Sequence, residues 1–303
     1  MIHLGKNMWG DPGSDTRYSV FSDKVITEDD VWKETIDFLP TQGFNTVLID
    51  VADAIQYETH PEISIKGAWS KDKLKKELDR MRSLGLTPLP KLNFSAGHDA
   101  WLKDYSRMLS TPIYYQVCED LIKEVAELFD YPEYFHVGLD EEDATSQSYY
   151  SYICVRQHDL WWHDAYFFFN VCENVGARPW VWADLCWSQP EIYLAKMPKS
   201  VLQSNWAYNP VKRLPDGSYK KVPYQTYVML EEAGFDQVPT SSACSFRYNS
   251  LETMELSKEH IAPERLVGHM TAPWYSTIHE LRYGLLHDAL LFGEAKKKIY
   301  PND

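Results

Sequence analysis

The fold follows from the stretch Gln42-Gly43-Phe44-Asn45-Thr46-Val47-Leu48-Ile49-Asp50. Gly43 is typical of the left-handed residue that ends a helix, and the apolar run after it predicts a short buried strand. The same order of helix, glycine and apolar run returns at Gly85, Gly176 and Gly234. A chain made of such units alternates helices with strands, which favours parallel strand pairing.

Working outward from this unit, we expect eight short strands separated by helices. Ser70 and Thr111-Pro112 mark two of the helix starts. Eight units in 303 residues favour a single (β/α)8 TIM barrel of the α/β class over an open doubly wound sheet, and we expect residues 1–303 to form one domain. The sequence has no Gly-x-Gly-x-x-Gly and no Walker loop, which weakens the nucleotide-binding alternative. The predicted strands lie near residues 2–8, 45–52, 87–93, 134–138, 179–184, 201–206, 237–241 and 266–273.

Composition excludes several classes of protein. Hydrophobic residues make up 44% and charged residues 24%, as in soluble globular proteins. The formal charge of −14 would repel a phosphate backbone, so we expect no nucleic-acid partner. No run of 18 apolar residues occurs, and we expect no membrane partner. The first residues, 1–5, lack a secretory signal, which indicates the cytoplasm, or the periplasm or exterior if a signal peptide has been removed.

The cysteines do not indicate a disulfide framework or a metal site. Their number is odd and their spacing is wide, which fits reduced thiols. We expect no cofactor and no bound metal. The five are Cys118, Cys154, Cys172, Cys186 and Cys244.

Polar and aromatic residues follow the predicted strands, where the open face of a barrel lies. Carboxylates and amides bind vicinal hydroxyls, and indole faces cover the C–H side of a sugar ring. The sequence therefore predicts an oligosaccharide or glycoside as the ligand. The residues are Lys6, Asn7, Asp50, Asp53, Asn93, His98, Asp140, Glu141, Asp184, Asn205, Trp206, Ser241, Trp274 and Tyr275.

The most informative segment is Tyr134-Phe135-His136-Val137-Gly138-Leu139-Asp140-Glu141-Glu142-Asp143. An apolar strand runs into four carboxyl groups, which cannot all stay ionised cheaply in a cleft. A carboxylic acid that keeps its proton is what cleavage of a glycosidic bond requires. Neighbouring side chains of a strand face opposite sides, so Asp140 and Glu141 share the cleft only if the strand ends near Gly138.

Two motifs resemble a known family. The segment His136-Val137-Gly138-Leu139-Asp140-Glu141 resembles the His-x-Gly-Gly-Asp-Glu signature of the glycoside hydrolase family 20 hexosaminidases. Upstream, Leu89-Pro90-Lys91-Leu92-Asn93-Phe94-Ser95-Ala96-Gly97-His98 is similar to that family's Pro-Glu-Ile-Asp-x-Pro-Gly-His strand. The helix and turn at 118–135 fit between them, so the resemblance covers roughly residues 66–145.

The resemblance implies a retaining mechanism in which the 2-acetamido oxygen of the substrate attacks the anomeric carbon. Glu141 would then be the general acid and base, and Asp140 would hold the acetamido N–H. His98 and His136 would support the loop and the acid. The remaining residues expected at the substrate are Asn93, Asp184, Trp182, Trp206, Trp274, Tyr275, Lys6 and Asn7.

The sequence also departs from the family pattern. Leu139 replaces the second glycine of the signature, which alters the turn. Lys6-Asn7 stands where the family usually has an arginine, and Trp274-Tyr275-Ser276 replaces Trp-x-Glu. Asn93 and Lys91 replace acidic residues of the third strand. These changes indicate hydrolysis with a different sugar preference.

Other interpretations stay open at this point. The chain could be a carbohydrate-binding barrel without turnover, a glycosidase for a sugar lacking the acetamido group, or a metal-dependent lyase or isomerase. Asp140 and Glu141, or more readily Glu142 and Asp143, could cap a helix beginning near Thr145.

Three further features have alternative roles. His98, His136 and Asp140 could bind zinc, although they lack His-x-x-x-His spacing. Asp184 could act as a second carboxylate, about 5–5.5 Å from Glu141 for retention or about 6.5–9.5 Å for inversion. The aromatic run 161–169 predicts packing against the barrel, and any exposed part of it would indicate a homodimer face.

Overall fold

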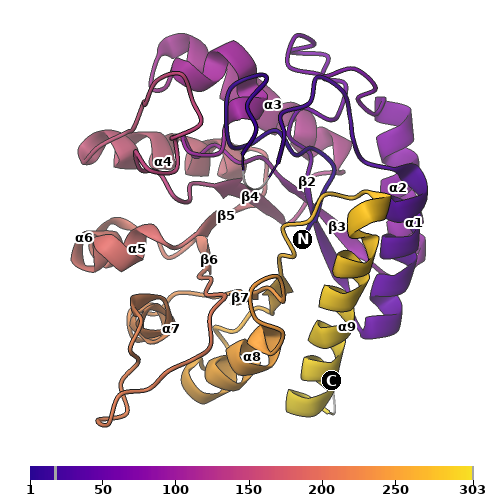
Figure 1. Ribbon diagram of the computed structural model, residues 1–303. Coiled ribbons are helices and arrows are strands. Elements are labelled where there is room, and N and C mark those ends of the chain that lie inside the picture. Colours follow the sequence, from indigo (N-terminus) through magenta and orange to yellow (C-terminus); the bar gives the residue numbers. More distant parts are fainter. Residues whose placement is uncertain (17–18, 302–303) are drawn as a thin grey trace.

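The computed structural model describes residues 1–16 and 19–301. Eight short strands surround a common centre, and the helices lie outside them (Figure 1). Every predicted strand is present, which confirms the barrel; the assignment of residues 1–303 to one domain stays a prediction. The strands are β1 (Ile2–His3), β2 (Thr46–Asp50), β3 (Thr87–Lys91), β4 (Tyr134–Gly138), β5 (Arg178–Trp182), β6 (Leu202–Ser204), β7 (Thr240–Ser241) and β8 (Met270–Thr271).

The strands are parallel and follow the order of the sequence. β1 to β6 form one sheet, and β7 pairs with β8. Single bridges join the two sheets, at Gln203 with Gln237 and at Trp206 with Thr240. The amino group of Met1 donates to the carbonyl of Thr271 at 2.6 Å, which brings β8 back to the beginning of β1. The strands from β1 to β6 are thus regularly paired, whereas fewer backbone contacts close the barrel from β6 through β8 to β1.

Helices follow the strands and cover the outside of the barrel (Figure 1). The α-helices are α1 (Asp29–Phe38), α2 (Lys71–Ser83), α3 (Pro112–Leu128), α4 (Asp159–Asn174), α5 (Leu185–Ser188), α6 (Pro190–Lys196), α7 (Val222–Glu232), α8 (Asn249–His260) and α9 (Arg282–Ile299). Short 3-10 helices are η1 (Leu39–Gln42), η2 (Ala100–Arg107) and η3 (His279–Leu281).

The local signals in the sequence have the expected structures. The hydroxyls of Ser70 and Thr111 accept from the backbone N–H groups of Lys73 and Tyr114, which caps α2 and α3. Gly43 adopts a φ of +81° after η1, and the glycines at the three other repeats also have positive φ. These residues end each helix and start the turn into the next strand.

Most strands are shorter than predicted, and in β1, β7 and β8 the backbone leaves the ladder early. After His3, the N–H groups of Leu4 and Gly5 both donate to the carbonyl of Asp50, so the chain bends away there. Pro239 and Pro273 have no N–H and cannot extend β7 or β8. The predicted helix near Thr145 is wrong, since turns and bends fill the chain from there to α4.

Alternation along the strands builds two apolar layers. Val47 and Ile49 of β2 pack outward against the helices, whereas Leu48 points into the barrel with Trp180 and Met270. The aromatic run 161–169 contributes Trp161, Trp162, Phe168 and Phe169 to the outer layer, and Tyr166 is partly exposed. The run is therefore mainly packing.

None of the described helices has the length and apolar content needed to cross a bilayer. The five cysteines all lie in the described part of the chain, and none of them forms a disulfide, which confirms the expectation of free thiols.

Asp53 predicts a pH dependence of stability. Burial raises its pKa to about 7, although the Nδ2 group of Asn7 donates to it at 2.7 Å. Unfolded, the group ionises near pH 4. Between pH 4 and 7 unfolding therefore releases a proton, and the free energy of unfolding should fall by a few kcal/mol as pH rises. Asp53→Asn should lessen this slope in urea titrations, since other buried acids also contribute to it, whereas exposed Asp104→Asn should keep it unchanged; equal slopes in all three proteins would contradict the assignment.

Candidate active site

The end of β4 turns sharply and brings two neighbouring acids to the same region. Gly138, Leu139 and Glu141 have φ values of +76°, +70° and +48°. This breaks the strand alternation that would place Asp140 and Glu141 on opposite sides. Leu139 adopts a left-handed conformation, at a cost of about 1–2 kcal/mol. Its side chain is buried in the outer apolar layer, which offsets that strain.

Asp140 is buried and held from the β3 side. Its Oδ1 accepts from Nδ2 of Asn93 at 2.8 Å, and its Oδ2 lies 3.3 Å from Nε2 of His98. Its carbonyl accepts from the Ser95 hydroxyl. A carboxylate with these partners has one orientation, so Asp140 is a fixed negative charge.

Glu141 has a different environment. Its side chain is 43% exposed, and Oε2 lies 3.3 Å from the same His98 Nε2. Its backbone N–H donates to Oδ2 of Asp184 at 2.8 Å. Glu141, Asp184 and Trp187 line a cleft of about 560 Å3 beside the β4 end. The two acids thus differ: Asp140 is enclosed and Glu141 faces a cleft.

The charges of this cluster compensate one another. Burial by itself would raise the pKa of Asp140, but the charge of His98 outweighs it and lowers the pKa to about 2. Burial would lower the pKa of His98, and the opposing charge of Asp140 raises it to about 10. Burial, with the charge of Asp140 adding to it, raises the pKa of Asp184 to about 8. At neutral pH the cluster thus contains a carboxylate, an imidazolium and a neutral acid.

The β3 and β4 ends approach as closely as their atoms allow. A Cβ on Gly138 would lie 1.9 Å from Oδ1 of Asn93, and φ there is positive. Oδ1 of Asn93 accepts from the N–H of Ser95, so the amide that holds Asp140 is itself fixed. Only glycine fits at position 138 without displacing Asn93.

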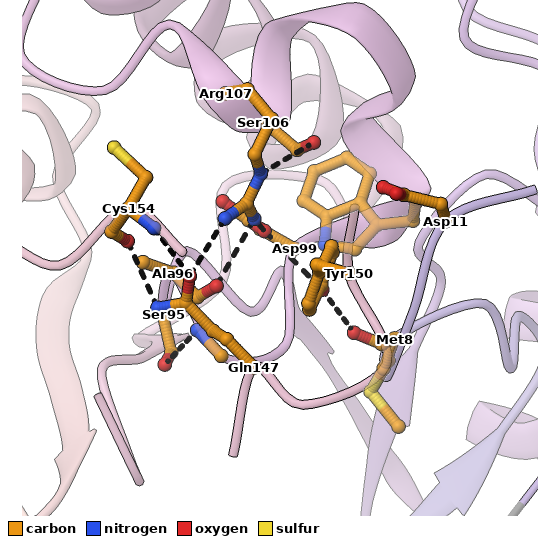
Figure 2. A network of polar contacts seen from close by, with 12 residues as sticks. Met8, Asp11, Ser95, Ala96, Asp99, Ser106, Arg107, Gln147, Tyr150 and Cys154 are labelled. Atoms are coloured by element: carbon orange, nitrogen blue, oxygen red, sulfur yellow. Dashed lines mark hydrogen bonds and ion pairs between the residues drawn. The ribbon is translucent and has the colours of Figure 1, made fainter. Parts of the chain in front are cut away.

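A polar network holds the loops that carry the cluster (Figure 2). The Arg107 guanidinium pairs with Asp99 and donates to the carbonyl of Ala96 and to Oε1 of Gln147. Gln147 bonds both the N–H and the carbonyl of Cys154. The loop after β3 is thereby joined to the loop after β4.

The two acids next to the pair are structural. Glu142 accepts from Nε of Arg156 at 2.6 Å, and both side chains are almost fully buried. Arg156 also donates to the carbonyl of Phe94. Asp143 accepts from the N–H groups of Thr145 and Ser146 and caps a turn. The helix-cap interpretation of these acids is wrong, because α4 begins only at Asp159.

Besides the two acids, His98 also has aromatic neighbours. Trp9 meets the His98 ring edge-on, with centroids 6.0 Å apart, and lies 6.5 Å from Trp274. Trp274 lies 6.1 Å from Trp182 and donates from Nε1 to the Tyr208 hydroxyl at 3.0 Å. Acids and indoles therefore adjoin at the carboxyl ends of the strands.

Several solved structures share this fold. A chitobiase of Flavobacterium johnsoniae has a TM-score of 0.60 at 15% identity, covering 90% of this chain and 49% of its own. The family 20 exo-β-N-acetylglucosaminidase of Vibrio harveyi, in complex with N-acetylglucosamine, has a TM-score of 0.61 at 14% identity. The match covers 97% of this chain and 57% of that structure. The β-N-acetylhexosaminidase of Bacteroides fragilis has a TM-score of 0.62 at 13% identity, and the match covers 86% of this chain and 62% of that structure.

The fold is that of the family 20 glycoside hydrolase barrel. This confirms the fold that the two motifs predicted, at a low identity that makes the chain divergent. The chain spans about half to three fifths of the length of these structures. No family model and no curated protein matches the sequence.

Within the barrel, three predicted substrate residues have other partners. The Lys6 ammonium donates to the carbonyl of Trp274 at 2.9 Å and lies 4.7 Å from the Trp9 ring centre. Asn7 bonds Asp53 and both backbone groups of Ser22. Tyr275 packs so closely on Gly284 of α9 that a Cβ there would lie 2.7 Å from its ring.

Two more predicted residues lie deeper in the barrel or beside it. His136 is fully buried between Trp180 and Trp182, with ring centres 5.0 and 4.6 Å away. Its Nδ1 accepts from the N–H of Gly138, so His136 stabilises the turn at the end of β4. It therefore does not join His98 in a metal site. Trp206 is half-buried and contacts Trp187 and Tyr208.

Sequence reasoning missed several residues of this region. Trp9 comes directly after the first predicted strand, 2–8. Tyr208 and Trp187 come two and three residues after the predicted strands 201–206 and 179–184, within the reach of a barrel loop. Arg156 gave no local signal, because its partner Glu142 is 14 residues away.

Gly138 provides a test of the close contact. Gly138→Ala should destabilise the protein by about 3 kcal/mol or more, since the methyl group displaces Asn93 in addition to the left-handed strain. The control is Gly85→Ala, which has the same positive φ with nothing within 4 Å and should cost only about 1–2 kcal/mol. Denaturant unfolding measures the stability of both variants. An equal loss of stability in the two would show that the Asn93 side chain can move aside at no cost.

Proposed function

We propose that this protein is a glycoside hydrolase that releases β-linked 2-acetamido sugars with retention at the anomeric carbon. The observation that carries the proposal is the pair at the end of β4. Asp140 is buried and fixed by Asn93 and His98, while the next residue, Glu141, faces a cleft. The fold of family 20 hydrolases supports the same assignment.

In the proposed reaction Glu141 donates a proton to the glycosidic oxygen as the bond to the anomeric carbon breaks. The acetamido oxygen of the substrate forms the new bond, and the Asp140 carboxylate accepts the acetamido N–H. Water then opens the cyclic intermediate while Glu141 takes back a proton. His98, 3.3 Å from both acids, balances the negative charge as Glu141 loses its proton.

The surroundings suggest where the two parts of the substrate lie. The partly exposed indole of Trp274, packed against the buried rings of Trp9 and Trp182, offers a face for the sugar that carries the acetamido group. The cleft beside Glu141, with Trp187 and Asp184 in its lining, would receive the leaving group, because the acid must lie between the two parts.

Variants of the pair test the roles. Glu141→Gln should lower kcat about 10²–10⁴-fold on substrates with poor leaving groups and much less on a dinitrophenyl glycoside, which leaves without protonation. Asp140→Asn should lower kcat for both. Exposed Asp143→Asn in the same loop is the matched control. A Glu141→Gln enzyme with unchanged turnover on both substrates would remove the assignment.

The nature of the nucleophile is tested by aryl glycosides that differ only at C2. The acetamido series should be cleaved, and a thiazoline that mimics the cyclic intermediate should inhibit. Preference for the 2-hydroxyl series would instead support a sugar without the acetamido group, with Asp184 as the second carboxylate.

A second candidate function is sugar binding without turnover. It is favoured by Lys6 and Asn7, whose polar groups already bond to the protein where the family pattern has an arginine for sugar hydroxyls. Calorimetry with N-acetylglucosamine oligomers would show binding, and long incubation would yield no product.

Trp187 tests the leaving-group cleft. Its Nε1 donates to Oδ1 of Asn205 at 2.8 Å, and its ring lines the cleft. Trp187→Ala should lower kcat/KM about 2–10-fold for a disaccharide and little for a methyl glycoside, because only the former reaches the ring. Trp187→Phe keeps a ring and should lose less. Equal losses on both substrates would indicate a structural role.

A further inference from the structure

Three side chains with metal-binding atoms converge at the β4 end. Nε2 of His98 lies 3.3 Å from Oδ2 of Asp140 and 3.3 Å from Oε2 of Glu141. All three atoms lie within 4.8 Å of one another. They come from two loops that are fixed by separate contacts, so the cluster belongs to the fold.

The distance of 3.3 Å between Nε2 of His98 and each carboxylate oxygen fits ligands of one metal ion better than a short hydrogen bond. In a tetrahedral zinc site with ligand distances of about 2.0–2.2 Å, two ligand atoms lie about 3.3–3.5 Å apart. A charge-assisted N–H···O bond is shorter, about 2.7–2.9 Å. The Glu141 side chain is partly exposed, so it has room to rotate toward a bound ion.

The surroundings orient the ligands and leave an approach for the ion. Asn93 holds Oδ1 of Asp140, which leaves Oδ2 to the cluster, and Asp184 holds the backbone of Glu141. Such outer contacts raise metal affinity by fixing ligand direction. The exposed side of Glu141 opens to the cleft and leaves a fourth position for water.

We propose that His98, Asp140 and Glu141 bind Zn²⁺ and that the bound ion inhibits the hydrolase. One imidazole with two carboxylates suits zinc, whereas magnesium prefers oxygen ligands and six-fold coordination. The ion replaces the proton on Nε2 of His98. With both acids as ligands, Glu141 holds no proton for the glycosidic oxygen and Asp140 accepts no acetamido N–H. The inhibition rests on the proposed function, but the binding does not.

Binding is measured with zinc chloride by calorimetry and with cobalt(II) by its visible absorption. The wild-type protein should bind one ion, and His98→Ala should weaken binding at least tenfold. The control is His60→Ala: His60 also meets two carboxylates, Glu62 at 3.0 Å and Asp120 at 3.3 Å, but through different nitrogens. It should bind as the wild type does, and circular dichroism checks that both variants fold.

Inhibition is measured on an aryl glycoside, with zinc added and then removed by a chelator. Competitive, reversible inhibition in wild type and His60→Ala supports the proposal. Equal binding in His98→Ala, or no binding in the wild type, overturns the site. Zinc bound with undiminished turnover overturns the inhibition alone. Zinc bound to a protein without glycosidase activity keeps the site and removes the proposed function.

Discussion

The close contact between Gly138 and Asn93 determines the geometry at the open end of the barrel. Because the β4 backbone passes against the Asn93 side chain, the amide reaches Asp140 with its nitrogen and Ser95 with its oxygen. The Ser95 hydroxyl in turn holds the carbonyl of Asp140. One steric constraint therefore sets the direction of the buried carboxylate and the relative position of two loops.

Buried charges, rather than regular secondary structure, fix those loops. Arg156 with Glu142 and Arg107 with Asp99 form ion pairs that are almost fully buried. Such pairs add little net stability, because desolvation offsets their attraction. Separating one is expensive, however, since it leaves a charge buried and unpaired. The loops after β3 and β4 are thus held in one arrangement although they contain few helical or strand hydrogen bonds.

Local signals in the sequence predicted the fold, because they act over a few residues. A glycine at the helix end and an apolar run after it located four strands, and the alternation of helices with apolar runs located the other four. The β3 and β4 motifs indicated the family fold. The contacts of Arg156, Trp9 and Tyr208 were not predictable, since their partners lie far along the chain or in loops. Tyr275 follows a predicted strand as Glu141 does, yet it packs on Gly284. Position after a strand does not determine where a side chain points.

The two halves of the site differ in how they are built, and this difference bears on specificity. The acids depend on short contacts within consecutive units, from β3 to β5, so neighbouring parts of the barrel set their arrangement. The aromatic side combines residues after β1, β5, β6 and β8, where the barrel closes through single bridges and the Met1 contact. Loops there can change without disturbing Asn93 or Gly138. Lys6, bonded to the Trp274 carbonyl, lies on this side. A change in one of these loops therefore alters the aromatic side more than the position of the acids.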